Sequence, residues 1–221
     1  QPPLDTTTFW YGTIGQPRRL DPARAYDTAS GEIISNVYEG LIVFNRTRLL
    51  RTNVDTPYYY TSIDSFEPLL SDWYTISDDG LTWTFHIRQG VKFHDWVDRN
   101  GTVHSGDLLT PEDVEYSFER GLVQDQIGSP QWMIYLPLTG QHNSDPWDVD
   151  EDGKLNTEEE ATAAAVLQNV ITRDDAARTV TFHLNFTFPK IAFMQILAQT
   201  WSMVGNKEMA VDYGCWPGTW N

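Results

Sequence analysis

The sequence has few residues that could cross-link the chain or attach it to an anionic partner. Among its 221 residues Cys215 is the only cysteine, so no disulfide can form within the chain. Only 15 Lys and Arg stand against 31 Asp and Glu, which gives a formal net charge of −16. Binding to nucleic acid or to an anionic membrane depends on basic residues, so this balance argues against both partners.

Long apolar runs and familiar catalytic motifs are also lacking. No apolar run reaches the roughly 18 residues that a membrane-spanning helix needs. The sequence holds no G-x-S-x-G, no Walker loop and no G-x-G-x-x-G, and its five histidines form no H-E-x-x-H. A hydrolase that uses Asp78 with Asp79, or Asp174 with Asp175, stays an alternative, although both pairs have the position of turn residues. We therefore do not expect an enzyme.

Aromatic residues, in contrast, make up 13% of the chain, and several segments have a clear strand or helix pattern. Residues 81–88 alternate apolar and polar side chains after an Asp-Gly turn, which predicts a hairpin with residues 73–77. Thr110 and Pro111 suit the cap and first position of a helix. The resulting fold class is a mixed α/β arrangement, or α+β. The other expected elements are strands at 8–13 and 179–184, helices at 29–40, 158–168 and 189–198, a loop or edge hairpin at 45–68, and a loop at 124–147.

The segment DVDEDGKLNTEE, residues 148–159, matches the calcium loop D-x-D-x-D-G-x5-E at every fixed position. Calcium prefers six to eight oxygen ligands, and Gly153 permits the tight turn that lets them converge. A capping box from Thr157 to Glu160 would start the exiting helix, whereas Pro146 leaves no entering helix. We expect a structural Ca²⁺ here; the alternative is a solvated acidic loop followed by a helix cap. The expected ligands are Asp148, Asp150, Asp152, the carbonyl of Lys154, Asn156 and Glu159.

Several tryptophans and tyrosines fall in segments that are expected to be loops. Flat aromatic rings on loops can stack on sugars or pack on peptide side chains, although most such rings belong to a core. Together with the calcium loop they support one function class, a calcium-stabilised carbohydrate-binding module. The residues concerned are Trp132, Tyr135, Trp216, Trp220 and the three tyrosines at 58–60.

A series of motifs runs in fixed order through most of the chain. It resembles the N-terminal half of the family 5 extracytoplasmic solute-binding proteins of ABC importers, which bind peptides, dipeptides, nickel or oligosaccharides. The carbohydrate-binding module does not explain this order. The motifs are LDP at 20–22, VYEGL at 37–41, PLLSDW at 68–73, DGLTWTFHIRQGVKFHD at 79–95, LTPEDVEYSF at 109–118 and TVTFHLNFTFPKIAFMQILAQTWSMV at 179–204.

The resemblance implies a non-enzyme outside the cytoplasmic membrane, either free or held by an anchor through a removed N-terminal segment. It implies a periplasmic-binding-protein-like fold that closes on a peptide or an oligosaccharide and delivers it to a membrane permease. Residues 1–45 with 165–221 would form a discontinuous first lobe, and residues 46–164 an inserted small domain. The second lobe would be absent from this chain.

Two segments depart from the family pattern, and one segment could face the ligand. Residues 96–107 interrupt the usual passage from F-H-D into the TPEDV helix, and the calcium loop is also additional. The loop after the first strand would face the cleft, where an arginine could pair with a carboxylate. The candidate ligand-binding residues are Gln16, Arg18, Arg19, Trp132 and Trp201.

Overall fold

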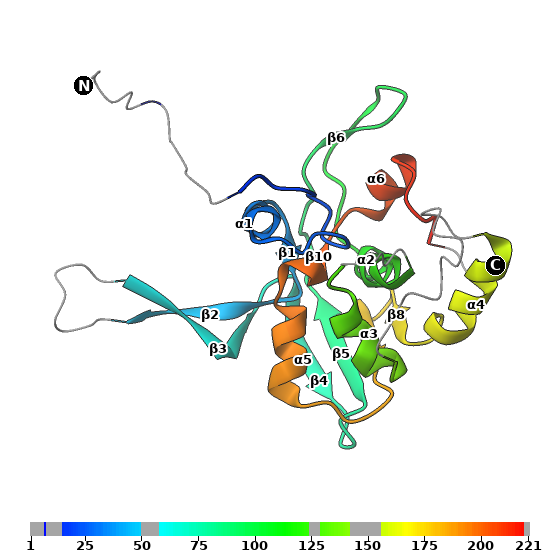
Figure 1. Cartoon of the computed structure of the whole chain (residues 1–221). Helices are drawn as coiled ribbons and strands as arrows, with labels where there is room; N and C mark the ends of the chain where they lie inside the picture. The colour runs from blue at the N-terminus through cyan, green and yellow to red at the C-terminus, as the bar shows by residue number, and fades with distance from the viewer. Residues whose placement is uncertain (1–6, 8–14, 50–57, 124–128, 142–155, 219–221) are drawn as a thin grey trace.

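The computed structural model describes the chain except for residues 1–6, 8–14, 50–57, 124–128, 142–155 and 219–221 (Figure 1). The largest sheet of the described residues has four antiparallel strands in the order β4-β5-β9-β8. This sheet joins strands that lie far apart in the sequence, and with its helices it confirms the mixed α/β class. Its strands are β4 Ser71–Ile76, β5 Thr82–Ile87, β8 Ile171–Asp174 and β9 Thr179–His183.

The β4–β5 hairpin forms where the sequence predicts it. Gly80 takes a φ of +73°, a backbone conformation that glycine adopts without strain, and Asp79 accepts a hydrogen bond from the backbone N–H of Leu81 (3.0 Å). The alternation along β5 sends one set of side chains into the core. The buried members of this set are Trp83, Phe85 and Ile87, none more than 1% exposed.

Helices pack on the buried side of the sheet, and α2 (Pro111–Val123) is the central one. It begins as predicted, because Thr110 and Asp113 cap each other. The N–H of Thr110 donates to Oδ2 of Asp113 (2.9 Å), and the N–H of Asp113 donates to Oγ1 of Thr110 (3.3 Å). Helix α2 contacts β8, β9 and three other helices. The remaining helices around it are α3 Trp132–Thr139, α4 Thr157–Leu167, α5 Lys190–Leu197 and α6 Lys207–Asp212.

Smaller elements surround this body. Two hairpins project from it in Figure 1, one formed by β2 and β3 and the other by β6 and β7. Helix α1 leads into β1, which pairs antiparallel with β10 from the C-terminal part of the chain. None of the described helices has both the length and the apolar character that crossing a membrane requires. The bounds are α1 Thr28–Val37, β1 Glu39–Gly40, β2 Ile42–Leu49, β3 Tyr58–Pro68, β6 Trp96–Val97, β7 Val103–His104, the 3₁₀ turn η1 Thr200–Ser202 and β10 Met203–Val204.

One predicted loop contains a helix. The prediction of a loop for residues 124–147 is wrong at α3, where Ile134, Tyr135 and Leu138 are buried in the core. Pro137 suggested a break, but it lies in the last turn, and Gly140 ends the helix with a φ of +77°. The other expected helices and the strand at 179–184 are confirmed with small shifts of their ends. At 45–68 the edge-hairpin alternative is confirmed as β2 and β3, and the strand expected at 8–13 lies outside the described residues.

The division of the chain into two discontinuous parts stays a prediction. Within the described residues, β4 and β5 come from the part assigned to 46–164, whereas β8 and β9 come from the part assigned to 165–221. The four strands share one continuous ladder of hydrogen bonds and one hydrophobic core. Any motion between the two parts therefore has to leave this sheet intact.

Candidate functional site

The segment that carries the predicted arginines is held against the start of α1. The buried hydroxyl of Ser30 accepts hydrogen bonds from the backbone N–H groups of Arg18 (3.0 Å) and Arg19 (3.2 Å). The same hydroxyl donates to Oδ2 of Asp27 (2.6 Å), the residue that caps α1. These bonds to Ser30 hold the pKa of Asp27 below its usual range. The backbone is thus fixed while the side chains of Gln16, Arg18 and Arg19 stay exposed.

A buried glutamine connects this segment with the two predicted tryptophans. Nε2 of Gln131 donates to the backbone oxygens of Ala23 and Trp201, each at 3.2 Å. Gln131 is 1% exposed and immediately precedes Trp132, whose side chain is 43% exposed. The ring of Tyr26 meets the half-buried ring of Trp201 edge to face, 6.0 Å between centroids. One amide therefore brings the backbones of three distant segments together and places an exposed tryptophan beside them.

Two buried polar atoms at this junction have no hydrogen-bond partner among the described residues: Oε1 of Gln131 and Nε1 of Trp201. Leaving such a group unpaired costs about 1–3 kcal/mol, and buried polar groups in folded proteins generally have a partner. The space around Gln131 is tight, since a Cβ added to Gly121 would lie 2.7 Å from that Oε1. The sequence pattern did not indicate Gln131, because a single polar residue before an apolar run carries no motif.

An ion pair anchors the same segment to α2. Both terminal nitrogens of the Arg120 guanidinium donate to the carboxylate of Asp21, Nη2 at 2.7 Å and Nη1 at 2.9 Å. Burial raises the pKa of Asp21, but the hydrogen bonds and charge of Arg120 outweigh it and leave the pKa below its usual value. Asp21 belongs to the LDP motif, so this pair explains why an acid stands there.

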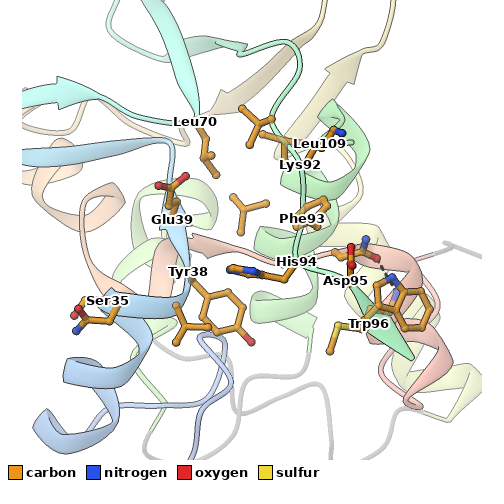
Figure 2. Close-up of a pocket in the computed structure, with 17 residues that line it drawn as sticks. Ser35, Tyr38, Glu39, Leu70, Lys92, Phe93, His94, Asp95, Trp96 and Leu109 are labelled. Carbon is orange, nitrogen blue, oxygen red and sulfur yellow. Dashed lines mark hydrogen bonds between the residues drawn. The ribbon is translucent and has the colours of Figure 1, made fainter. Parts of the chain in front are cut away.

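A hollow lies at the other end of α1 (Figure 2). Its volume is about 500 Å³, and the side chains of Tyr38, Phe93 and His94 reach into it. Burial raises the pKa of the Tyr38 hydroxyl, and the negative charge of Asp21 raises it further. The positive charge of Arg120 acts in the opposite direction. None of the five predicted ligand-binding residues lines this hollow. Residues 91–95 (V-K-F-H-D) form one wall of the hollow. In the sequence, the adjacent His94 and Asp95 were the only indication of a polar site in this segment.

Most of the predicted calcium loop lies outside the described residues, including Asp148, Asp150, Asp152 and Lys154. The two described ligands form a helix cap. Oδ1 of Asn156 accepts from the N–H groups of Glu158 (3.0 Å) and Glu159 (3.1 Å), and the Glu159 carboxylate accepts from the N–H of Asn156 (2.8 Å). The capping box predicted for Thr157 and Glu160 is therefore wrong by one residue, because the helix begins at Thr157.

Two of the loop aromatics belong to the core. Tyr135 is fully buried, and Trp216 is 7% exposed and stacks on Tyr116, whose hydroxyl donates to its backbone oxygen (2.8 Å). Burial raises the pKa of Tyr116. Their burial leaves Tyr135 and Trp216 no face for a sugar. Trp220 and the side chains of the tyrosines at 58–60 lie outside the described residues, so Trp132 is the exposed member of this set that the structure describes.

Comparison with known proteins places these features in a family context. The sequence profile of the bacterial extracellular solute-binding proteins, family 5 middle region, matches residues 65–214. The glutathione-binding protein GsiB of Salmonella typhi is 34% identical over 89 residues, which cover 40% of this chain and 14% of that protein. Heme-binding protein A of Haemophilus influenzae is 33% identical over 116 residues, which cover 52% of this chain and 18% of that protein.

Solved structures show the same fold. A periplasmic oligopeptide-binding protein of Borrelia burgdorferi is 24% identical, with a TM-score of 0.56 over 90% of this chain and 31% of its own. The DppA protein of Helicobacter pylori, solved with the peptide STSA, is 23% identical, with a TM-score of 0.52 over 88% of this chain and 30% of its own. The chain thus spans less than a third of the length of these four proteins.

Proposed function

The chain belongs to the bacterial extracellular solute-binding proteins of family 5, and from this membership we propose that it is part of the binding component of an ABC importer. In this role it captures short peptides outside the cytoplasmic membrane and presents them to a membrane permease. The similar structures of peptide-binding proteins support the peptide assignment. The proposed role is binding and delivery, without catalysis.

The observation that carries this proposal is the face beside the start of α1. There, Ser30 fixes the backbone of Arg18 and Arg19 while both side chains are exposed. Tyr26, whose ring meets that of Trp201 edge to face, directly precedes the same helix. A peptide offers the matching chemistry: a terminal carboxylate for a guanidinium and apolar side chains for aromatic rings. A neutral oligosaccharide could stack on the aromatic rings, but it has no negative charge to pair with Arg18 or Arg19. The peptide is therefore the better match.

The proposed contact between these arginines and the terminal carboxylate of a peptide can be tested with the full-length gene product. Peptides of two to five residues with a free C-terminus should bind about 10-fold more tightly than their C-terminal amides, since one charged hydrogen bond contributes about 1.5 kcal/mol. Isothermal titration calorimetry measures the difference directly. The double substitution Arg18→Gln and Arg19→Gln should remove the preference for the free acid.

The matched control is Arg88→Gln, an exposed arginine whose salt bridge to Asp72 lies on the β4–β5 hairpin. It should leave the affinity and the preference unchanged. Equal affinity for acid and amide would contradict the assignment of the arginines. Binding of oligosaccharides or heme in place of every peptide, glutathione included, would contradict the proposed ligand class.

We also propose that the segment 148–159 holds a structural Ca²⁺. The motif itself supports this, and the cap formed by Asn156 and Glu159 begins the helix that such a loop would lead into. Removing calcium with EGTA should lower the melting temperature by several degrees, because an ion that binds only the folded state stabilises it. Differential scanning calorimetry with and without calcium tests this.

The variant Asp150→Asn keeps the size of one predicted ligand and removes its charge. Its melting temperature should no longer respond to calcium, while peptide affinity stays as in the natural protein. Identical melting curves of the natural protein in EGTA and in calcium would show that the loop is a solvated acidic segment.

A further inference from the structure

Three side chains with metal-binding atoms converge between the β6–β7 hairpin and α6: His104, Asp107 and Glu208. One ligand atom from each lies within 4.8 Å of the others. Nδ1 of His104 faces Oε1 of Glu208 at 3.8 Å. We propose that these residues form a zinc site that joins the hairpin to α6. This proposal does not depend on the identity of the transported solute.

The imidazole of His104 is oriented as a metal ligand would be. It stacks on Trp96, with 4.0 Å between ring centroids and an angle of 13°. Its other nitrogen, Nε2, lies 3.4 Å from Oδ2 of Asp98. A metal-bound histidine commonly donates its second ring N–H to a carboxylate, which fixes the ring and leaves the first nitrogen free for the ion. Asp98 is itself held by the backbone N–H groups of Asn100 (2.9 Å) and Thr102 (2.7 Å).

The carboxylates combine one fixed group with one adjustable group. Oδ2 of Asp107 accepts from Nε1 of Trp96 (2.8 Å) and from Nδ2 of Asn206 (3.3 Å), so this side chain is positioned by its neighbours. The Glu208 side chain is 68% exposed and can rotate toward the ion. Ligand atoms around a tetrahedral zinc lie about 3.4 Å apart, so a small movement of Glu208 closes the cluster.

The hairpin and α6 already lie against each other without an ion. Asp107 and Glu208 also line an open hollow of about 500 Å³ beside α6, whereas His104 does not line it. Two further contacts hold the hairpin there: the N–H of Arg99 donates to Asp212 (2.9 Å), and the hydroxyl of Tyr213 donates to the backbone oxygen of Val97 (2.7 Å). The two elements are thus held together before any ion arrives.

The donor set decides which ion fits. One imidazole nitrogen and two carboxylates suit zinc, which accepts three protein ligands with water in the fourth position. Calcium and magnesium prefer oxygen ligands in larger number and do not use imidazole in this way. The zinc site is therefore distinct in chemistry from the predicted calcium loop.

The test is zinc titration of the full-length gene product by calorimetry, with calcium at about 1 mM to keep the acidic loop filled. We expect one zinc ion to bind and to raise the melting temperature. His104→Ala and Asp107→Asn should each weaken zinc binding at least 10-fold and abolish the thermal shift. Circular dichroism establishes that each variant is folded, and either variant alone is sufficient for the test.

His86 provides a matched control. It also stacks on a tryptophan, Trp73, and also pairs with an aspartate, Asp72 (3.2 Å), but among the described residues it belongs to no cluster of three ligands. His86→Ala should therefore leave zinc binding unchanged. The proposal is overturned if the natural protein binds no zinc, if zinc binding survives His104→Ala undiminished, or if His86→Ala weakens it equally.

Discussion

Replacing Phe182 with alanine is expected to lower the free energy of unfolding by about 4 kcal/mol, the upper range for a buried aromatic residue. Phe182 is fully buried on β9, and its ring meets three other rings nearly at right angles: Phe85 at 5.7 Å, Phe118 at 4.9 Å and Phe193 at 6.0 Å. These rings come from β5, α2 and α5, so one side chain joins the sheet to both helices. Neighbours fixed on three elements cannot collapse into the space left behind.

Urea-induced unfolding measures this change, and Phe186→Ala is the control on the same stretch of chain. Phe186 is 39% exposed and should lose less than about 1 kcal/mol on truncation. If the two substitutions destabilise the protein equally, the side chains around Phe182 are loosely packed. A change at Phe182 below about 2 kcal/mol would lead to the same conclusion.

Substitution of Arg120 with methionine is expected to lower the free energy of unfolding by about 3 kcal/mol, because it leaves the carboxylate of Asp21 without its partner. The Arg120 side chain is 11% exposed and that of Asp21 33% exposed, so water compensates only part of the loss. The segment that follows Arg19 would also lose its anchor on α2. Peptide affinity should therefore fall together with stability.

The pH dependence of unfolding separates the charge from the packing. Arg120 lowers the pKa of Asp21 in the folded protein below 3.8, its unfolded value. The stability from this pair is therefore fully present above that value and is lost as the pH falls through the lower folded pKa. Asp21→Asn should be destabilised at neutral pH and should lack this part of the acid transition. An unchanged acid transition in Asp21→Asn would mean that other carboxylates dominate it.

Local patterns predicted the elements whose stabilising contacts are close in sequence. The alternation of Trp83 and Phe85 after a turn at Gly80 predicted the β4–β5 hairpin, and Thr110 followed by Pro111 predicted the start of α2. Each of these signals involves a side chain and a backbone group within a few residues. The ordered motifs likewise predicted the family, which the match over residues 65–214 confirms.

Contacts between distant residues carried no such signal. Gln131 bonds to a residue 108 positions away, and Arg120 pairs with Asp21 across 99 positions, so neither role can be inferred from neighbouring residues. The helix α3 was missed because Pro137 suggested a break, while burial of Tyr135 in the core favours the helix. His104 and Glu208 were missed as a pair for the same reason, since the fold alone brings them together.

The central sheet has a consequence for how the newly made chain folds. The β4–β5 hairpin is local and can form early. The other edge of β5 stays unpaired until β9 has been made, because Thr84 on β5 pairs with Thr181 on β9, 97 residues later. Until then, the unpaired backbone edge of β5 lies open to any other extended chain. Pairing across so many residues slows folding, so this protein should depend on holding chaperones during synthesis more than a protein built of local hairpins does.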